Sequence, residues 1–122
     1  MGKEFQLWWK VKIKPGKASE LRKMASALTA RNQSEERGTI MYHIYMNKEE
    51  TLLTFVETYA GADAQFLHAE RFLGGEFVGP FLESVETVKK VFYGAVPQSR
   101  IDWYIAQGFD FEVHPLVNGF LR

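Results

Sequence analysis

The residues of this sequence that are best suited to proton transfer are its three histidines, His43, His68 and His114. Histidine titrates near neutral pH, and it works as a general base where it faces a dry cleft. Ala64, Leu67 and His68 have the spacing of residues on one side of a helix, so His68 would lie on the apolar side of that helix. His68 is therefore the first candidate catalytic base, with a purely structural role as the alternative, and His43 is the second candidate.

Glu57 is a carboxylate within an otherwise apolar run that predicts a strand. A buried carboxylate must be paired or hydrogen-bonded, and we expect Arg71 or a lysine to pair with it. This structural pairing is favoured over acid–base chemistry. The hydroxyls of Tyr42, Tyr45 and Tyr59 could orient a polar atom of a ligand, although aromatic residues on strands are commonly part of a core.

The sequence lacks the residues and motifs of several common classes of enzyme. There is no cysteine, which excludes thiolate nucleophiles, disulfides and cysteine-based metal sites. A P-loop, a GxGxxG fingerprint, an HExxH helix, an EF-hand loop and a GxSxG elbow are all missing. The three histidines also lack the short-range spacing that is typical of a metal site. We expect no metal and no cofactor.

Composition and charge limit the classes of partner. The chain has 122 residues, which suits one domain, and its 15 basic and 15 acidic residues cancel. A neutral chain lacks the long-range field of a nucleic-acid binder, and no apolar run approaches the about 20 residues that span a bilayer. We expect a soluble cytoplasmic protein with no nucleic-acid or membrane partner. Aromatic residues make up 15% of the chain, which suits a large core, an apolar pocket or a dimer interface.

The elements that must position these side chains follow from hydrophobic periodicity. Alternating apolar residues predict strands over 5–13, 38–47, 51–59 and 85–93, and helical spacing predicts helices over 18–31 and 62–72, with a short turn or helix over 77–83. The order β-α-β-β-α-β is that of a ferredoxin-like α+β fold. In that fold a four-stranded antiparallel sheet carries both helices on one face.

One face of this sheet would be left bare. Met41, His43 and Tyr45, or else their neighbours on the alternate face, would lie there together with Trp8. Such a patch is larger than monomers usually leave in water. A twofold contact reuses one patch, so we expect a homodimer that forms through the sheet face.

The last stretch of the chain is an addition to the predicted core. We divide the chain into a ferredoxin-like domain over 1–94 and a C-terminal extension over 95–122. The extension contains a predicted helix over 99–107 and a short strand over 109–113. Because it is too apolar for a disordered tail, we expect it to pack on the core, the mouth of the pocket or the partner subunit.

Several short strings of the sequence resemble one known family. The segments 14–18 (KPGKA), 36–39 (ERGT) and 56–59 (VETY), with Tyr42, His43, Ala64 and His68 between and after them, stand in the order and spacing found in that family. They resemble the antibiotic biosynthesis monooxygenases, which are dimeric α+β barrel proteins. The resemblance covers roughly residues 5–94.

The resemblance implies a way of working. Proteins of that family are homodimers with a pocket between sheet and helices, and several oxidise quinol-like or polycyclic aromatic substrates with O₂ without a metal or flavin. By this similarity His68 is the candidate base or hydrogen-bonding partner, and a small aromatic is the expected ligand. The candidate substrate-binding residues are Trp9, Tyr42, Tyr59, Glu57 and Phe72.

Other functions remain open at this point. The same family includes haem-degrading enzymes, which use an Asn in the first strand where Trp9 stands here and a Trp about where His68 stands, so haem degradation is disfavoured. A non-catalytic dimeric module that binds or senses a small apolar metabolite would need the same apolar pocket as an enzyme. A purely structural dimer would have that pocket filled.

Overall fold

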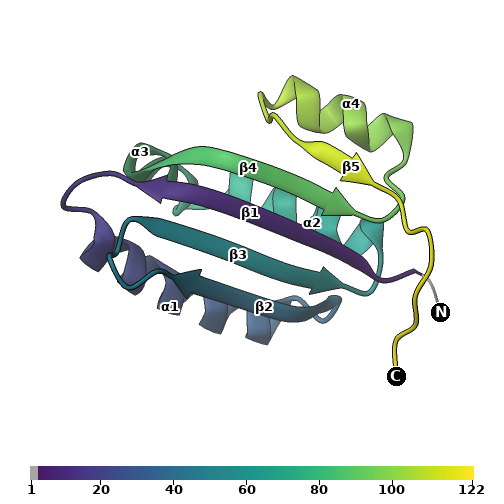
Figure 1. Cartoon of the computed structure of the whole chain (residues 1–122), viewed down its shortest axis with the longest axis horizontal. Coiled ribbons are helices and arrows are strands. Elements are labelled where there is room, and N and C mark those ends of the chain that lie inside the picture. The colour runs from purple at the N-terminus through teal and green to yellow at the C-terminus, as the bar shows by residue number, and fades with distance from the viewer. Residues whose placement is uncertain (1–2) are drawn as a thin grey trace.

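Nine elements follow one another along residues 3–122, which the computed structural model describes (Figure 1). They are β1 (Phe5–Ile13), α1 (Ala18–Glu35), β2 (Thr39–Met46), β3 (Leu52–Tyr59), α2 (Ala62–Leu73), α3 (Val78–Ser84), β4 (Val85–Tyr93), α4 (Gln98–Ala106) and β5 (Glu112–His114). The predicted ferredoxin-like order is confirmed. The first helix continues past its predicted end at Arg31, because Asn32 is buried and its carbonyl accepts a hydrogen bond from the Glu36 N–H.

The sheet has five strands in the order β2-β3-β1-β4-β5. The first four are antiparallel neighbours, as the alternating pattern predicted, whereas β5 runs parallel to β4. The predicted four-stranded sheet therefore has a fifth member, because the short strand predicted in the C-terminal extension joins it. The added strand is only three residues long, and α4 forms the crossover that parallel pairing requires.

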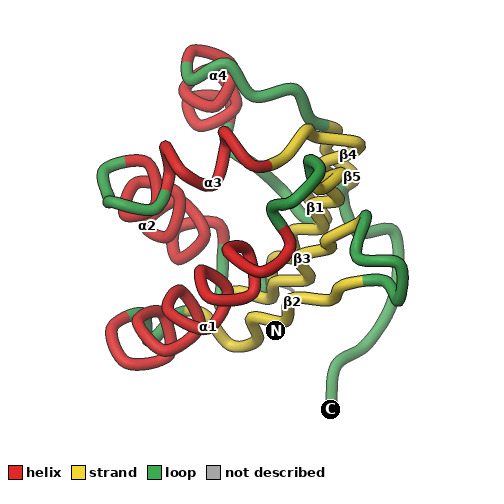
Figure 2. Tube along the Cα trace, turned by 90° about the vertical axis from the view of Figure 1, so that its left-hand side faces the viewer, coloured by secondary structure: helices red, strands yellow, loops and turns green. Residues whose placement is uncertain are grey.

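The helices lie together on one side of the sheet (Figure 2). Phe5, Leu7, Trp9, Val11 and Ile13 of β1 point toward them and are buried. Trp8 points to the other face and is 46% exposed. Within the described part of the chain, none of the helices is long and apolar enough to cross a bilayer.

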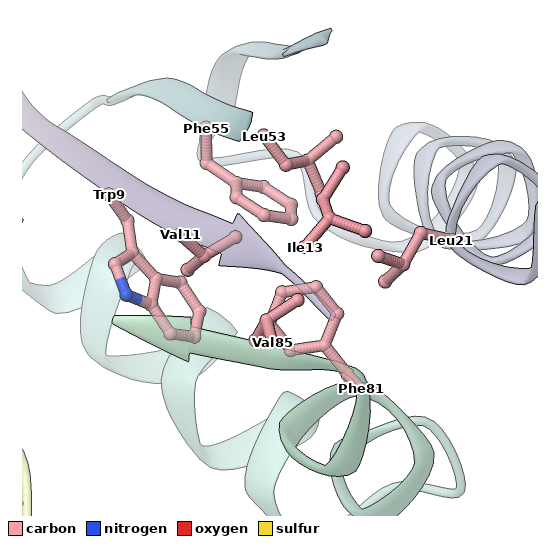
Figure 3. Packing of buried hydrophobic residues seen from close by; sticks show 8 residues of the cluster. All are labelled: Trp9, Val11, Ile13, Leu21, Leu53, Phe55, Phe81 and Val85. Atoms are coloured by element: carbon pink, nitrogen blue, oxygen red, sulfur yellow. The ribbon is translucent and has the colours of Figure 1, made fainter. Parts of the chain in front are cut away.

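The main core lies between the sheet and helices α1 and α3. It consists of Trp9, Val11, Ile13, Leu21, Leu53, Phe55, Phe81 and Val85, which converge from four elements and the start of β4 (Figure 3). Burying a large apolar side chain contributes about 1.5–3 kcal/mol. This layer therefore fixes the distance between the sheet and its helices, and with it the space available beside them.

The C-terminal segment packs on a second core cluster at the other end of β1. Phe5, Leu7 and Phe92 of the sheet belong to this cluster together with Tyr104 of α4, which is 1% exposed and packs against the ring of Phe92. The Tyr104 hydroxyl also donates a hydrogen bond to the Gln65 side chain on α2. Helix α4 is thus joined to α2 and to the sheet by both apolar and polar contacts.

Candidate functional site

A small cavity lies between the sheet and helix α2. Its apolar wall includes Trp9, Tyr42, Phe55, Phe72, Phe81 and Phe109. Its polar groups are Glu57, Gln65, His68 and Lys90. The open volume is about 30 Å³, which is room for one or two water molecules. A few convergent polar groups in an aromatic wall are the usual composition of a small-molecule site.

His68 occupies the centre of the polar side and is 8% exposed. Its Nδ1 lies 2.8 Å from Oε1 of Glu36 and bonds to it, while its Nε2 lies 3.6 Å from Oε1 of Glu57. The rings of Tyr42 and Tyr59 pack against the imidazole, with centroids at 5.5 and 5.6 Å. The imidazole is therefore fixed between two carboxylates and two phenol rings.

Glu36 follows the last residue of α1 and is 4% exposed. It accepts hydrogen bonds from Thr39 Oγ1 at 2.9 Å and Arg71 Nε at 3.0 Å in addition to the bond from His68. Burial by itself raises the pKa of Glu36, but the bond and charge of His68, with the bonds from Thr39 and Arg71, lower it overall. Glu36 is therefore an ionised carboxylate at neutral pH.

A close contact holds Glu36 and helix α2 in place. Gly38 is the residue immediately before β2, and a Cβ at this position would lie 2.6 Å from the Cβ of Ala64 on α2. Only a residue without a side chain allows the backbone to approach α2 this closely. Because Ala64 precedes His68 by one helical turn, the contact helps to set the distance between His68 and Glu36.

Glu57 is the second carboxylate and is 2% exposed. Burial raises its pKa, and the charge of His68 and a hydrogen bond donated by the Tyr59 hydroxyl offset this only in part. The predicted partner Arg71 is wrong, because Arg71 binds Glu36 and Glu35 instead. Among the lysines, for which the sequence singled out no position, Lys90 is the one whose charge acts on Glu57, and it forms no hydrogen bond with Glu57 among the contacts of residues 3–122.

The two carboxylates set the protonation of His68. Burial lowers the pKa of His68, but the bond to Glu36 and the charges of Glu57 and Glu36 outweigh this and raise it above 6.5. The imidazolium form is therefore more stable than in a free histidine, and it faces Glu57. The pair formed by Glu57 and His68 can hold or release a proton at the surface of the cavity.

Lys90 brings a further cation into the cavity wall and is 7% exposed. Its Nζ lies 4.3 Å from the ring centroid of Trp9 and 3.9 Å from that of Phe109. Burial lowers its pKa from 10.5 to about 8, although Glu57 acts in the opposite direction. Both flanking rings are the kind of partner that a desolvated cation prefers.

The structure brings together most of the residues that the sequence indicated. His68, Trp9, Tyr42, Glu57 and Phe72 all line the cavity. Tyr59 lies behind Glu57 and reaches the site through its hydroxyl. Burial and the nearby carboxylates raise the pKa of both Tyr42 and Tyr59 well above 10, so each phenol remains protonated.

His43 does not join this group. It lies on the opposite face of the sheet, is exposed, and pairs with the Tyr45 hydroxyl at 3.2 Å. The strand register explains this placement, because Tyr42 stands opposite Glu57 and the next residue must point the other way. His114 is also remote, since it lies on β5 and contacts Glu112. In residues 3–122 no cluster of three His, Asp or Glu side chains is arranged to hold a metal.

Three functional groups of the site were not predicted, namely Glu36, Gln65 and Lys90. Lys90 was read only as part of the last strand of the core. Its inward direction follows from the register of β4, in which it stands opposite Trp9. Glu36 lies next to the segment that carries the family resemblance, yet it follows a helix and no periodicity assigns it to the interior.

The sequence matches no family model, and no curated protein matches it either. Solved structures share its fold. MupZ from Pseudomonas fluorescens is 18% identical with a TM-score of 0.73, over 98% of this chain and 95% of that one. The alignment therefore includes the C-terminal segment that forms α4 and β5.

Other similar structures bear the family name that the sequence suggested. A "putative antibiotic biosynthesis monooxygenase" from Caulobacter crescentus CB15 is 29% identical with a TM-score of 0.52, over 62% of this chain and 67% of that one. Its namesake from Nitrosomonas europaea is 19% identical with a TM-score of 0.63, over 79% and 93% of the two chains. The chain thus has the fold of proteins with this name, which supports the resemblance.

Proposed function

We propose that this chain is a homodimeric oxygenase that oxidises a small, electron-rich aromatic substrate with O₂ and uses no metal or flavin. One observation carries the proposal, which is the buried proton-transfer group of Glu57 and His68 in the wall of an aromatic cavity. Buried charges are costly and need a function or a partner to explain them. The shared fold with the antibiotic biosynthesis monooxygenases supports the same reaction class.

In the proposed reaction, the Glu57 carboxylate removes a proton from the substrate, and the imidazolium of His68 beside it is the cationic member of the pair. For an anthrone-type substrate, the CH₂ group loses a proton to the pair, and the resulting anion forms a C–O bond with O₂. The peroxide takes the proton back and then loses water, so that R₂CH₂ and O₂ give R₂C=O and H₂O. The fixed cations of His68 and Lys90 stabilise the anion that forms before oxygen adds.

Entry of an aromatic ring requires the cavity to widen. At about 30 Å³ the open space is smaller than any quinol. Phe109 is the wall residue best placed to move, because it is only partly buried and lies in the irregular stretch between α4 and β5. Loops of this kind are the usual gates of enzyme sites. We therefore assign entry to a displacement of Phe109.

Oxygen uptake tests this function. A panel of quinols and anthrones should be oxidised by the wild type, and His68→Gln should lower the rate by about 10²–10⁴-fold, as expected for loss of one member of the proton-transfer pair. His114→Gln is the matched control, because His114 is exposed and distant from the cavity. Equal rates for the wild type and His68→Gln would remove His68 from the mechanism.

The same panel distinguishes an enzyme from a binding module. An apolar metabolite can be bound without buried charges, and this is why we favour the enzyme. Calorimetric binding of a quinol or anthrone by the wild type, without any oxygen uptake, would replace the oxygenase with a dimeric binding or sensing module. If no compound binds, the cavity is closed core and both functions are excluded.

The homodimer in this proposal forms through the bare sheet face. Trp8, Tyr45, Val88 and Tyr93 are between 38% and 57% exposed there. They surround a shallow hollow that is mostly apolar, with Lys10 and Lys89 at its border. A second copy with the same patch would cover both faces at once, since a twofold contact is self-complementary.

A further inference from the structure

The amino group of Lys90 is buried without a hydrogen bond among the contacts of residues 3–122. Its side chain is 7% exposed, and its Nζ interacts with aromatic rings and with the charge of Glu57. Its close neighbours are the rings of Trp9 and Phe109, at 4.3 and 3.9 Å. Buried polar groups are normally hydrogen-bonded, so an unpaired one that lines a cavity suggests contact with a ligand.

The charges around Lys90 come from two other elements. Glu57 on β3 attracts its ammonium, and His68 on α2 lies on the same cavity. Strand β1 and the loop after α4 also border Lys90, and they contribute only the uncharged rings of Trp9 and Phe109. Lys90 therefore lies in an apolar space that also contains one carboxylate and one imidazole.

We propose that Lys90 Nζ is a nucleophile that captures small aldehydes and ketones as imines inside the cavity. This activity goes beyond the oxygenase function and does not depend on it, because no oxygen is consumed. Desolvated lysines in hydrophobic pockets are the ones that form Schiff bases. The geometry provides such a pocket, and the residue on the adjacent position of the strand, Lys89, lies outside it.

The chemical step balances without an added oxidant or reductant. The neutral amine attacks the carbonyl carbon, a C–N bond forms, and the carbonyl electron pair moves to oxygen, which takes up a proton. The nitrogen then loses its protons while the C–O bond breaks and water leaves. Glu57 and His68 line the same cavity, so they can give and take these protons.

The protonation of Lys90 supports the reaction. Burial lowers its pKa to about 8, against an ordinary value of 10.5. Below pH 8 this difference gives Lys90 about 300-fold more neutral amine than a lysine with the ordinary value. The open volume of about 30 Å³ further limits the carbonyl compound to the smallest members of the class.

Reductive trapping tests the proposal directly. The full chain is incubated with formaldehyde and sodium cyanoborohydride at pH 7, and peptide mapping locates the methyl groups, with the chain's α-amino group counted separately. We expect Lys90 to be alkylated at least tenfold faster than Lys48. Lys48 is the control, because it is exposed in the turn between β2 and β3 and lies outside both the cavity and the hollow of the sheet face.

Two variants and one condition complete the test. Lys90→Met should lose the fast alkylation, whereas Lys48→Met should retain it. In guanidinium chloride the wild type should alkylate Lys48 and Lys90 at the same rate, which shows that the fold creates the preference even if Lys90→Met does not fold. Equal rates at Lys48 and Lys90 in the folded wild type, or no label on Lys90, would overturn the proposal.

Discussion

At the scale of single residues, the site is defined by how Glu36 orients His68. The bond between Nδ1 and Glu36 at 2.8 Å fixes the orientation of the ring and directs Nε2 toward Glu57 and the cavity. Carboxylates that orient a catalytic imidazole in this way are common in proton-transfer sites. Glu36 is therefore a positioning residue in the proposed mechanism, because it acts through His68.

Replacing Glu36 by Gln should separate these effects. Without the carboxylate, burial dominates and the pKa of His68 should fall, which can be followed by NMR titration of its ring protons. The free energy of unfolding should decrease by about 3–5 kcal/mol, as for other broken buried ion pairs. Glu35→Gln is the control, because Glu35 is half exposed and contacts only Arg71. An unchanged His68 titration in Glu36→Gln would contradict the role given to Glu36.

The raised pKa of His68 has a consequence for stability against pH. Since the folded value lies above 6.5, the imidazolium stabilises the fold in full below pH 6.5, and this contribution is lost as pH rises through the folded value. We expect the stability of the wild type relative to His68→Gln to decrease above pH 6.5 in urea denaturation. A difference that stays constant from pH 6 to 9 would show that folding does not shift the pKa of His68.

At the scale of elements, the contact between Gly38 and helix α2 positions both halves of the site. Gly38→Ala should cost about 1–3 kcal/mol, because the added methyl would meet Ala64 at 2.6 Å. Gly79→Ala is the control, since nothing lies within 4 Å of a Cβ there. The double variant Gly38→Ala with Ala64→Gly should recover part of the loss in urea denaturation. Full stability of Gly38→Ala alone would show that α2 is free to shift.

The sequence was sufficient to predict the strands and helices that have a strong hydrophobic periodicity. The strands β1 to β4 and the helix α2 were predicted within about two residues, because alternation and helical spacing are local signals. Strand β5 was predicted as a short strand, but its pairing with β4 depends on where α4 packs. That packing rests on long-range contacts of Tyr104, which no local pattern encodes.

The site was only partly predictable for the same reason. His68 stood out because it interrupts an apolar stripe, and Glu57 because it interrupts an apolar strand. Lys89 and Lys90 are adjacent, and two adjacent lysines in a sequence indicate a strand in contact with solvent. Which of the two points inward is decided by the bulge in the pairing of β1 with β4, and the sequence does not reveal that bulge. The partner of Glu57 was missed because residues far apart in sequence meet only through the fold.

At the scale of the whole molecule, the bare face of the sheet leads to a prediction about assembly. Trp8→Glu should convert a homodimer into a monomer, because a buried unpaired charge would stand on both sides of the twofold contact. Light scattering would then report a mass near 14.1 kDa, and about twice this value for the wild type. Ile105→Glu is the control, since Ile105 is 60% exposed but lies on α4. A wild-type mass near one chain would contradict the dimer.

The position of β2 at the end of the sheet has a consequence for handling the protein. This strand has eight residues, TIMYHIYM, without Lys, Arg, Asp, Glu or Pro, and no described strand covers its outer edge. Segments of this composition with open backbone groups are templates for amyloid-like stacking. Arg37 and Lys48 flank it as charged gatekeepers. When the chain is synthesised or heated, β2 is therefore the segment from which fibrils would nucleate.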